Sequence, residues 1–230
     1  TWFRSQEYYN SGGWRATWGG EGGGVLLNQC PHQLDLLQWL CGMPTRVHAT
    51  CGIGKYHQIE VEDEVNAMLE YANGATGVFV TSTGEAPGTN RLELVGTRGR
   101  LVIENGPVRF TRNEIPSDRF CAETRERFAV PPVWNIEIPT AGSGGQHGEI
   151  LQNFTDAIRK QTPLIAPATE GIHSVELGNA MLLSGLTGKA VDMPLNATSY
   201  ARRLKKLIRE STFRKAAGSD DVEADMSASF

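Results

Sequence analysis

The sequence predicts an α+β fold, an open and mostly antiparallel β-sheet with helices packed on one of its faces. Short alternating or β-rich runs, separated by turn sequences, fill residues 45–112. Consecutive strands joined by such turns form an antiparallel meander. Helical patterns, with apolar residues at spacings of three and four, lie before and after these runs. An open sheet needs helices over one face, which leaves its other face solvated or used in association.

The predicted strands are short segments with turn-like separators such as Ala72-Asn73-Gly74. They are Val47–Cys51, Asp63–Tyr71, Thr76–Thr83, Arg91–Val95, Arg100–Glu104 and Val108–Thr111. Prolines limit long elements in residues 113–148, where Glu126–Val130 and Val133–Ile138 could form one more hairpin. Residues 141–148 are a glycine-rich loop that contains His147. Apolar side chains left on the outer face favour a homodimer or homotetramer through the open sheet.

The stretch of residues 22–42 opens with three glycines and continues as a helical pattern up to Gly42. Its buried face is predicted to consist of Leu26, Cys30, Leu34, Leu37 and Cys41. Asn28, His32 and Asp35 recur at spacings of four and three on a different face. Pro31 requires either that the regular helix begins near residue 28 or that the chain bends just before His32.

Three later segments have helical periodicity. Residues 149–161 form an amphipathic helix, with Ile150, Phe154, Ala157 and Ile158 predicted to point inward. Thr169 is a candidate N-cap for a second helix that reaches about Leu186 and leads to a short strand at residues 190–192. We therefore expect one domain over residues 1–195, a basic helix over residues 196–217 and a flexible tail over residues 218–230.

Composition excludes several classes of protein. The 230 residues are 40% hydrophobic and 21% charged with a net charge of −4, which argues against nucleic-acid binding. No apolar run is long enough for a membrane span, and the first residues do not resemble a signal peptide. The four cysteines have no CxxC spacing, so we expect reduced thiols, no metal site and a cytoplasmic protein. The missing initiator methionine suggests that the segment continues something before it.

The spacing of Asn28, His32 and Asp35 suggests a general acid/base unit, because a carboxylate one turn away can fix the tautomer of a histidine. The alternative is a histidine that only satisfies a helix-packing hydrogen bond. Aromatic residues and arginines crowd residues 1–21, where Arg15 and Trp18 either line a polar-ligand pocket or belong to a packing loop. His147 could enter the same pocket. The three glycines lack a preceding strand and the GxGxxG spacing, so they have no predicted phosphate role.

The ordered residues Glu21, Gly22–Gly24, His32, Asp35, Gly42 and Pro44 give a more specific indication. This pattern resembles the signature helix of the Gfo/Idh/MocA oxidoreductases, the superfamily of glucose–fructose oxidoreductase and inositol dehydrogenase. Later segments follow the same order: IEVED at 59–63, NGA at 73–75, ELVGTRG at 93–99 and a closing helix near residues 170–186. The resemblance covers about residues 1–195 and is to the C-terminal domain only.

The resemblance implies an NAD- or NADP-dependent enzyme whose cofactor is held mainly by an N-terminal Rossmann domain, absent here together with the catalytic lysine of the family. It implies that His32 exchanges a proton with a sugar or cyclitol hydroxyl while hydride passes to nicotinamide. The family aspartate four residues earlier is replaced by Asn28, and Asp35 would support the histidine. A small polyhydroxylated substrate would contact Arg15, Trp18, Gln29 and His147.

Two other functions are compatible with these residues. One is a non-catalytic binding or assembly module of the same fold, which Asn28 in place of aspartate favours. The other is a relative that oxidises its substrate transiently to epimerise a centre or to eliminate a glycosidic bond. In every case the present chain alone is expected to be inactive.

Overall fold

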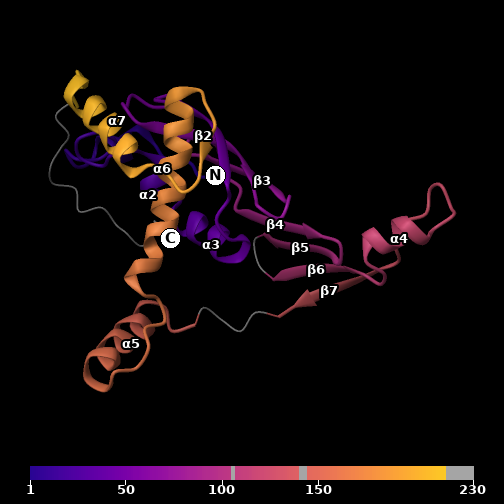
Figure 1. Cartoon of the computed structure of the whole chain (residues 1–230). Coiled ribbons are helices and arrows are strands. Elements are labelled where there is room, and N and C mark those ends of the chain that lie inside the picture. Colours follow the sequence, from indigo (N-terminus) through magenta and orange to yellow (C-terminus); the bar gives the residue numbers. More distant parts are fainter. Residues whose placement is uncertain (105–106, 140–143, 216–230) are drawn as a thin grey trace. The chain divides into compact units, whose positions relative to one another are not determined.

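A computed structural model describes residues 1–104, 107–139 and 144–215 (Figure 1). The chain divides into two compact units, one made of residues 1–88 together with the segment from Pro167 onward, the other of residues 89–166. Residues 1–195, predicted as one domain, are therefore shared between the two units. The predicted tail at residues 218–230 lies outside the described residues.

The first unit is built on a four-stranded antiparallel sheet of order β3-β2-β1-β8. The strands are β1 (Arg46–Ile53), β2 (Glu62–Glu70), β3 (Thr76–Ser82) and β8 (Val191–Asp192). Val47 pairs with Leu69 and Ala49 with Ala67, and all four side chains are buried. Alternate residues of β1 and β2 therefore face the core, as a half-buried sheet requires.

Helices cover that buried face. The long helix α6 (Gly171–Thr187) packs against β1, and α3 (Pro31–Cys41) packs against α6. The short helix α2 (Val25–Asn28) contacts β2. The unit also contains α1 (Gln6–Asn10), the 3-10 turn η1 (Ala168–Glu170) and α7 (Ala197–Glu210). Fully buried members of the core are Tyr9, Val25, Leu26, Cys30, Leu34, Val61, Val65, Leu177, Met181 and Leu182.

Pro31 divides the predicted helix of residues 22–42 into α2 and α3. It occupies the first turn of α3, where a missing backbone donor costs nothing. The bend expected just before His32 is thus present. Leu26, Cys30 and Leu34 are buried as predicted, and Leu37 and Cys41 are half-buried. Gly42, with φ of 75°, ends the helix in the left-handed region that glycine adopts without strain.

The second unit is a separate four-stranded antiparallel sheet of order β4-β5-β6-β7, with two helices. Its elements are β4 (Arg91–Gly96), β5 (Gly99–Glu104), β6 (Val108–Asn113), α4 (Ser117–Glu123), β7 (Val133–Ile138) and α5 (Gln146–Lys160). The α+β class with antiparallel strands is confirmed. The strands expected in one meander fall into two sheets, because residues 83–90 are too long and irregular for a tight hairpin turn.

The structure corrects three details in residues 113–187. Glu126–Val130 is not a strand, and β7 pairs with β6 instead. Helix α4 was not predicted. Thr169 lies in η1, and Glu170 rather than Thr169 is the N-cap of α6.

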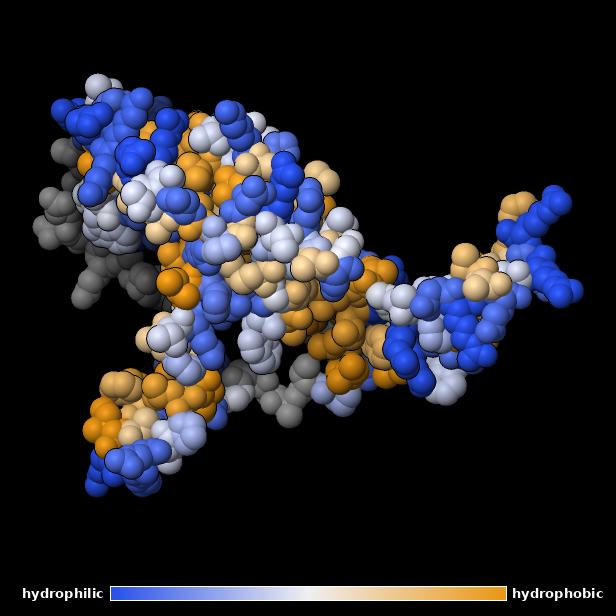
Figure 2. Space-filling view, in the orientation of Figure 1, coloured by the Kyte–Doolittle hydropathy of each residue, from blue (hydrophilic) through white to orange (hydrophobic). Residues whose placement is uncertain are grey.

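The apolar stripe of α5 also differs from its prediction. Ile150, Phe154 and Ile158 are exposed rather than inward, and Figure 2 shows hydrophobic residues at the surface of α5. The periodicity identified the helix correctly, but it could not show whether another element covers the stripe. The glycine-rich loop is shorter than expected, since α5 already begins at Gln146 and contains His147.

Candidate functional site

The predicted acid/base residues lie at the junction of α2 and α3. Asn28 is the last residue of α2, and His32 is the second residue of α3. His32 is exposed and makes no hydrogen bond to any described residue, whereas Asp35 accepts one from Gln38 at 2.9 Å. Asn28, His32 and Asp35 therefore share a region of the surface but are not joined by hydrogen bonds.

Asn28 belongs instead to a polar network around the hydroxyl of Tyr8. The Tyr8 hydroxyl donates to Asn28 Oδ1 at 2.9 Å and accepts from Arg15 Nη1 at 2.6 Å and from Gln29 Nε2 at 3.0 Å. The guanidinium of Arg15 also stacks over the Tyr8 ring, 4.3 Å from its centroid. We call Tyr8, Arg15, Glu21, Asn28 and Gln29 the Tyr8 cluster.

Glu21 places a carboxylate in this cluster. Its side chain accepts hydrogen bonds from the side-chain amide of Asn28 and from the backbone N–H of Ala16, the latter at 2.7 Å. Burial raises the pKa of Glu21, and these two hydrogen bonds together with the nearby Arg15 charge partly oppose that rise. The site therefore contains a carboxyl group beside residue 28, although residue 28 itself is an amide.

Two polar atoms of the Tyr8 cluster are buried and have no partner in the described part of the chain. They are Nε of Arg15 and Oε1 of Gln29. A buried donor or acceptor without a partner costs about 1–3 kcal/mol, so each gains by meeting a hydroxyl group. The pair offers one donor and one acceptor, which is what a polyhydroxylated ligand can satisfy.

The stretch of three glycines allows α2 to pack closely against Glu62. Backbone N–H groups of Gly24 and Leu26 donate to Oε1 of Glu62 at 2.8 and 3.2 Å. A Cβ at Gly24 would lie 2.1 Å from the backbone oxygen of Glu62, so only glycine fits. Burial raises the pKa of Glu62 to about 7, and its Oε2 has no partner in the described residues. Because the Gly24 amide is already used, this loop does not form a phosphate cradle.

The acidic residues of the IEVED segment each hold a different part of the unit. Glu60 accepts from the backbone N–H of Trp18 at 2.8 Å, and Glu62 holds α2 as described. Asp63 accepts from the N–H of Tyr56 at 2.8 Å and faces Nδ1 of His57 at 3.0 Å. The sequence had suggested only that a strand opens here, and the structure shows that the segment also anchors three loops.

The predicted substrate residues lie in three different places. Arg15 and Gln29 join Asn28 in the Tyr8 cluster. Trp18 is only 5% exposed and packs in the hydrophobic core, while His147 is exposed on α5 in the unit of residues 89–166. Tyr8 and Glu21 were not predicted as site residues. Glu21 is part of the signature pattern, and Tyr8 is one of the aromatic residues in residues 1–21. Neither pattern indicated which side chains they would contact.

No group of three or more histidine, cysteine, aspartate or glutamate side chains in the described residues could hold a metal ion. Within the same residues, no helix is both long and apolar enough to cross a membrane. Cys30 is fully buried, and burial raises the pKa of its thiol to about 12, which does not suit a nucleophile at neutral pH.

Comparison with known proteins gives a match over the part of the chain that contains the signature residues. Residues 1–102 match the family model described as the GFO/IDH/MocA C-terminal domain. This part of the chain is similar to the C-terminal domain of that family of oxidoreductases. The expected resemblance is thereby confirmed over these residues, which include the Tyr8 cluster, both helices of the junction and the IEVED segment.

Among curated proteins, levoglucosan dehydrogenase of Pseudarthrobacter phenanthrenivorans is 23% identical over 218 residues, covering 79% of this chain and 54% of that enzyme. The protein y4oX of Sinorhizobium fredii, of uncharacterised function, is 23% identical over 180 residues, covering 76% of this chain and 49% of its own length. The chain therefore spans about half the length of the curated relatives it matches.

Solved structures share the fold. Levoglucosan dehydrogenase in complex with NADH and levoglucosan aligns with a TM-score of 0.63 at 20% identity, over 84% of this chain and 56% of that one. The WlbA dehydrogenase of Bordetella pertussis, in complex with NADH and UDP-GlcNAcA, aligns with a TM-score of 0.59 at 22% identity, over 85% and 52%. At these identities the likeness concerns the fold.

Proposed function

We propose that this chain is the substrate-binding and oligomerisation part of an NAD- or NADP-dependent oxidoreductase that acts on a sugar or cyclitol. The observation that carries the proposal is the Tyr8 cluster, which brings a phenol, a guanidinium, a carboxyl and two amides together one turn from His32. Such groups recognise hydroxyls by pairing donors with acceptors. Relatives that bind levoglucosan or a UDP-sugar together with NADH support this substrate class.

A nicotinamide cofactor, when bound, would supply the hydride acceptor, and the residues of this chain would orient the hydroxyl and move its proton. His32 takes the proton, because it is exposed and no described residue occupies its ring nitrogens. Asn28, Gln29 and Arg15 hold neighbouring hydroxyls through the Tyr8 cluster, and Asp35 adds negative charge near the imidazole. The Gly24 amide is bonded to Glu62, so it is not available to the phosphates of the cofactor, which a Rossmann domain would hold, as the resemblance implies.

The test requires the complete enzyme, because the isolated chain is proposed to be inactive. His32→Ala should lower turnover by about 10²–10⁴ without loss of folding, the usual contribution of a general acid/base. His173→Ala, an exposed histidine on α6, is the matched control and should leave turnover unchanged. Equal turnover in the wild type and the His32→Ala variant would refute the role of His32.

Association is proposed to use the outer face of the first sheet. Met68, Val78 and Val80 are exposed there, and they are apolar side chains that a monomer leaves in water. We propose a homodimer or homotetramer of a cytoplasmic enzyme. Val78→Asp should shift the sedimentation coefficient to that of the monomer, whereas His173→Asp should not, because His173 is exposed on α6, which packs against the opposite face of the sheet. A wild-type monomer at high concentration would contradict this part of the proposal.

Asn28 favours a second candidate, a non-catalytic binding module, because the amide cannot carry a proton away from His32. Activity of the complete protein with NAD or NADP on any small polyol would exclude the module. If the only product is an epimer or a cleaved glycoside, with no net reduction of the cofactor, transient oxidation is the outcome. Substrate contacts from Trp18 and His147 stay predictions.

A further inference from the structure

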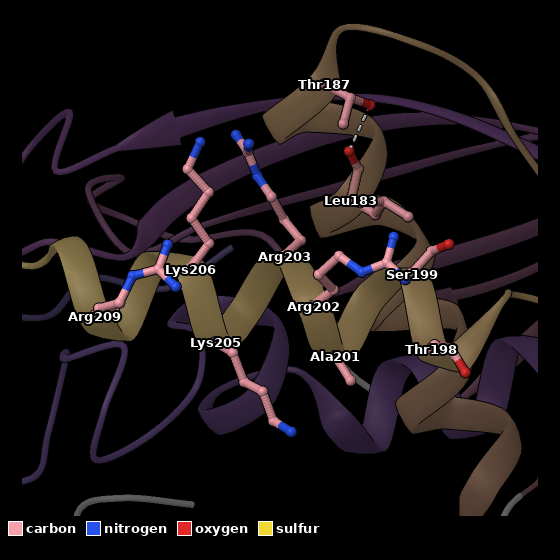
Figure 3. A pocket seen from close by; sticks show the side chains of 10 residues that line it. All are labelled: Leu183, Thr187, Thr198, Ser199, Ala201, Arg202, Arg203, Lys205, Lys206 and Arg209. Atoms are coloured by element: carbon pink, nitrogen blue, oxygen red, sulfur yellow. Dashed lines mark hydrogen bonds between the residues drawn. The ribbon is translucent and has the colours of Figure 1, made fainter.

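A second site lies away from the Tyr8 cluster, between the last turns of α6 and one face of α7. Here an open pocket of about 930 Å³ is lined mainly by basic and hydroxyl side chains. Its lining residues are Leu183, Thr187, Thr198, Ser199, Ala201, Arg202, Arg203, Lys205, Lys206 and Arg209 (Figure 3). We call it the basic pocket.

The sequence concentrates positive charge at this pocket. Seven of the 22 lysines and arginines lie between residues 202 and 215, where the only acidic residue is Glu210. Arg202, Lys206 and Arg209 recur at spacings of four and three, which places them on one side of α7. Figure 3 shows Arg203, Lys206 and Arg209 on the side of Thr187, with Lys205 pointing to the opposite side.

The positive groups are poorly neutralised. Glu210 is 3.9 Å from Lys206 and 3.3 Å from Arg209, and it sits at the far end of the helix. Arg202 has no ion-pair partner among the described residues. Arg203 donates a hydrogen bond to the carbonyl oxygen of Leu186 at 3.3 Å. Its Nε is buried and has no hydrogen-bond partner among the described residues. A purely structural role, capping the end of α6, accounts for Arg203 but not for the other cations.

The chemistry of the lining favours phosphate over a simple counterion. Guanidinium groups bind phosphate through two parallel hydrogen bonds, and Thr198 and Ser199 add hydroxyl donors at the same edge. Residues 202–209 cover about 10 Å of helix at 1.5 Å per residue. That length exceeds what one phosphate can contact and suits a ligand that carries two.

We propose that the basic pocket binds a diphosphate, either inorganic pyrophosphate or the diphosphate of a nucleotide. The ligand would place its phosphates along Arg202, Lys206 and Arg209, and Arg203 would use its unpartnered Nε. The proposal is independent of the oxidoreductase function, since it uses no residue of the Tyr8 cluster.

Isothermal titration of the full chain in about 50 mM salt, with pyrophosphate and separately with ADP, tests the proposal. Both should bind at one site per chain, and binding should weaken as salt increases. Tighter binding of ADP would identify a nucleotide as the source, and equal affinities would identify the free diphosphate. Absence of saturable binding, or equal binding of sulfate, would overturn the proposal.

Variants connect the binding to the pocket. Arg202→Glu with Lys206→Glu should weaken binding at least 10-fold, and Arg202→Gln with Lys206→Gln should weaken it less. Arg159→Glu with Arg214→Glu changes the same charge at two residues outside the pocket lining, so it should weaken binding less than twofold. Both pairs are exposed, and circular dichroism will show whether they fold alike. Equal losses in the two Glu pairs would mean a general charge effect and refute the site.

Discussion

The side-chain amide of Asn28 donates a hydrogen bond to the carboxylate of Glu21, seven residues earlier in the chain. Glu21 also accepts from the backbone of Ala16, and Asn28 accepts from Tyr8, so the pair joins the N-terminal loop to the end of α2. Asn28 thus has a carboxylate directly beside it. Two carboxylates at these positions would repel each other.

Asn28→Asp should therefore destabilise the chain at high pH. At pH 8 two ionised carboxylates would meet in a partly buried site, at a cost of about 1–2 kcal/mol in the free energy of unfolding. At pH 5 the cost should shrink, because the pKa of Glu21 is already raised and one carboxyl can hold a proton. Urea unfolding at both pH values measures this. Asn90→Asp, in an exposed loop, is the control, and a pH-independent loss would contradict the explanation.

Tyr8→Phe should weaken substrate binding in the complete enzyme more than turnover. The change removes the hydroxyl that joins Asn28, Arg15 and Gln29, while the ring that stacks under Arg15 remains. We expect KM to rise about 5–10-fold, the effect of roughly one hydrogen bond, with kcat changed less than threefold. Tyr56→Phe, whose hydroxyl bonds to Glu64, should leave both constants unchanged. A fall in kcat alone would assign Tyr8 to the chemical step.

Gly24→Ala should prevent normal packing of α2. Its Cβ would lie 2.1 Å from the backbone oxygen of Glu62, and backbone atoms cannot move aside easily. We expect a loss of about 3 kcal/mol or more in the free energy of unfolding, or no folded protein. Gly13→Ala is the matched control, because a Cβ there meets nothing within 4 Å. A Gly24→Ala chain as stable as the wild type would show that this contact is wrong.

Glu62→Gln should change how stability depends on pH. The folded pKa of about 7 lies above the unfolded value of 4.5, so the folded state binds more protons between these values. Stability of the wild type should therefore fall as pH rises from 4.5 to 7, by up to about 3 kcal/mol from this group. The glutamine variant should lose most of that slope and keep the part due to Glu21. Parallel stability curves from pH 4 to 8 would rule out a buried carboxyl with a raised pKa.

Much of the fold could be predicted because it depends on local patterns. Strands β1 to β6 and helices α5 and α6 appear within a few residues of their expected positions, and α7 begins as expected but ends at Glu210, since period and turn residues mark these elements directly. Gly42 likewise marked the end of α3, whereas Pro31 left two alternatives open, a helix that begins near residue 28 or a bend just before His32. The two-sheet arrangement, helix α4 and the exposed stripe of α5 depend on contacts that a local pattern does not contain.

The candidate site was predictable only in part. The signature indicated Asn28, His32 and Gln29, and the aromatic loop indicated Arg15. Their meeting point, the hydroxyl of Tyr8, lies twenty residues from Asn28 in sequence and depends on the path of residues 11–20. That path includes Ala16 in the left-handed region, with φ of 57°. Alanine rarely adopts this conformation, so the sequence gives no indication of it.

The contact of Gly24 with Glu62 positions α2, and it involves different residues from those that we propose to contact the substrate. Either residue, changed alone, disturbs the position of α2, so selection should keep both fixed as a coupled pair. Arg15 and Gln29, which we propose as substrate contacts, form no hydrogen bond with either of them among the described residues. If the proposed function holds, descendants of this chain could exchange Arg15 and Gln29 and so change the sugar that is accepted, while the packing that positions α2 and His32 stays the same.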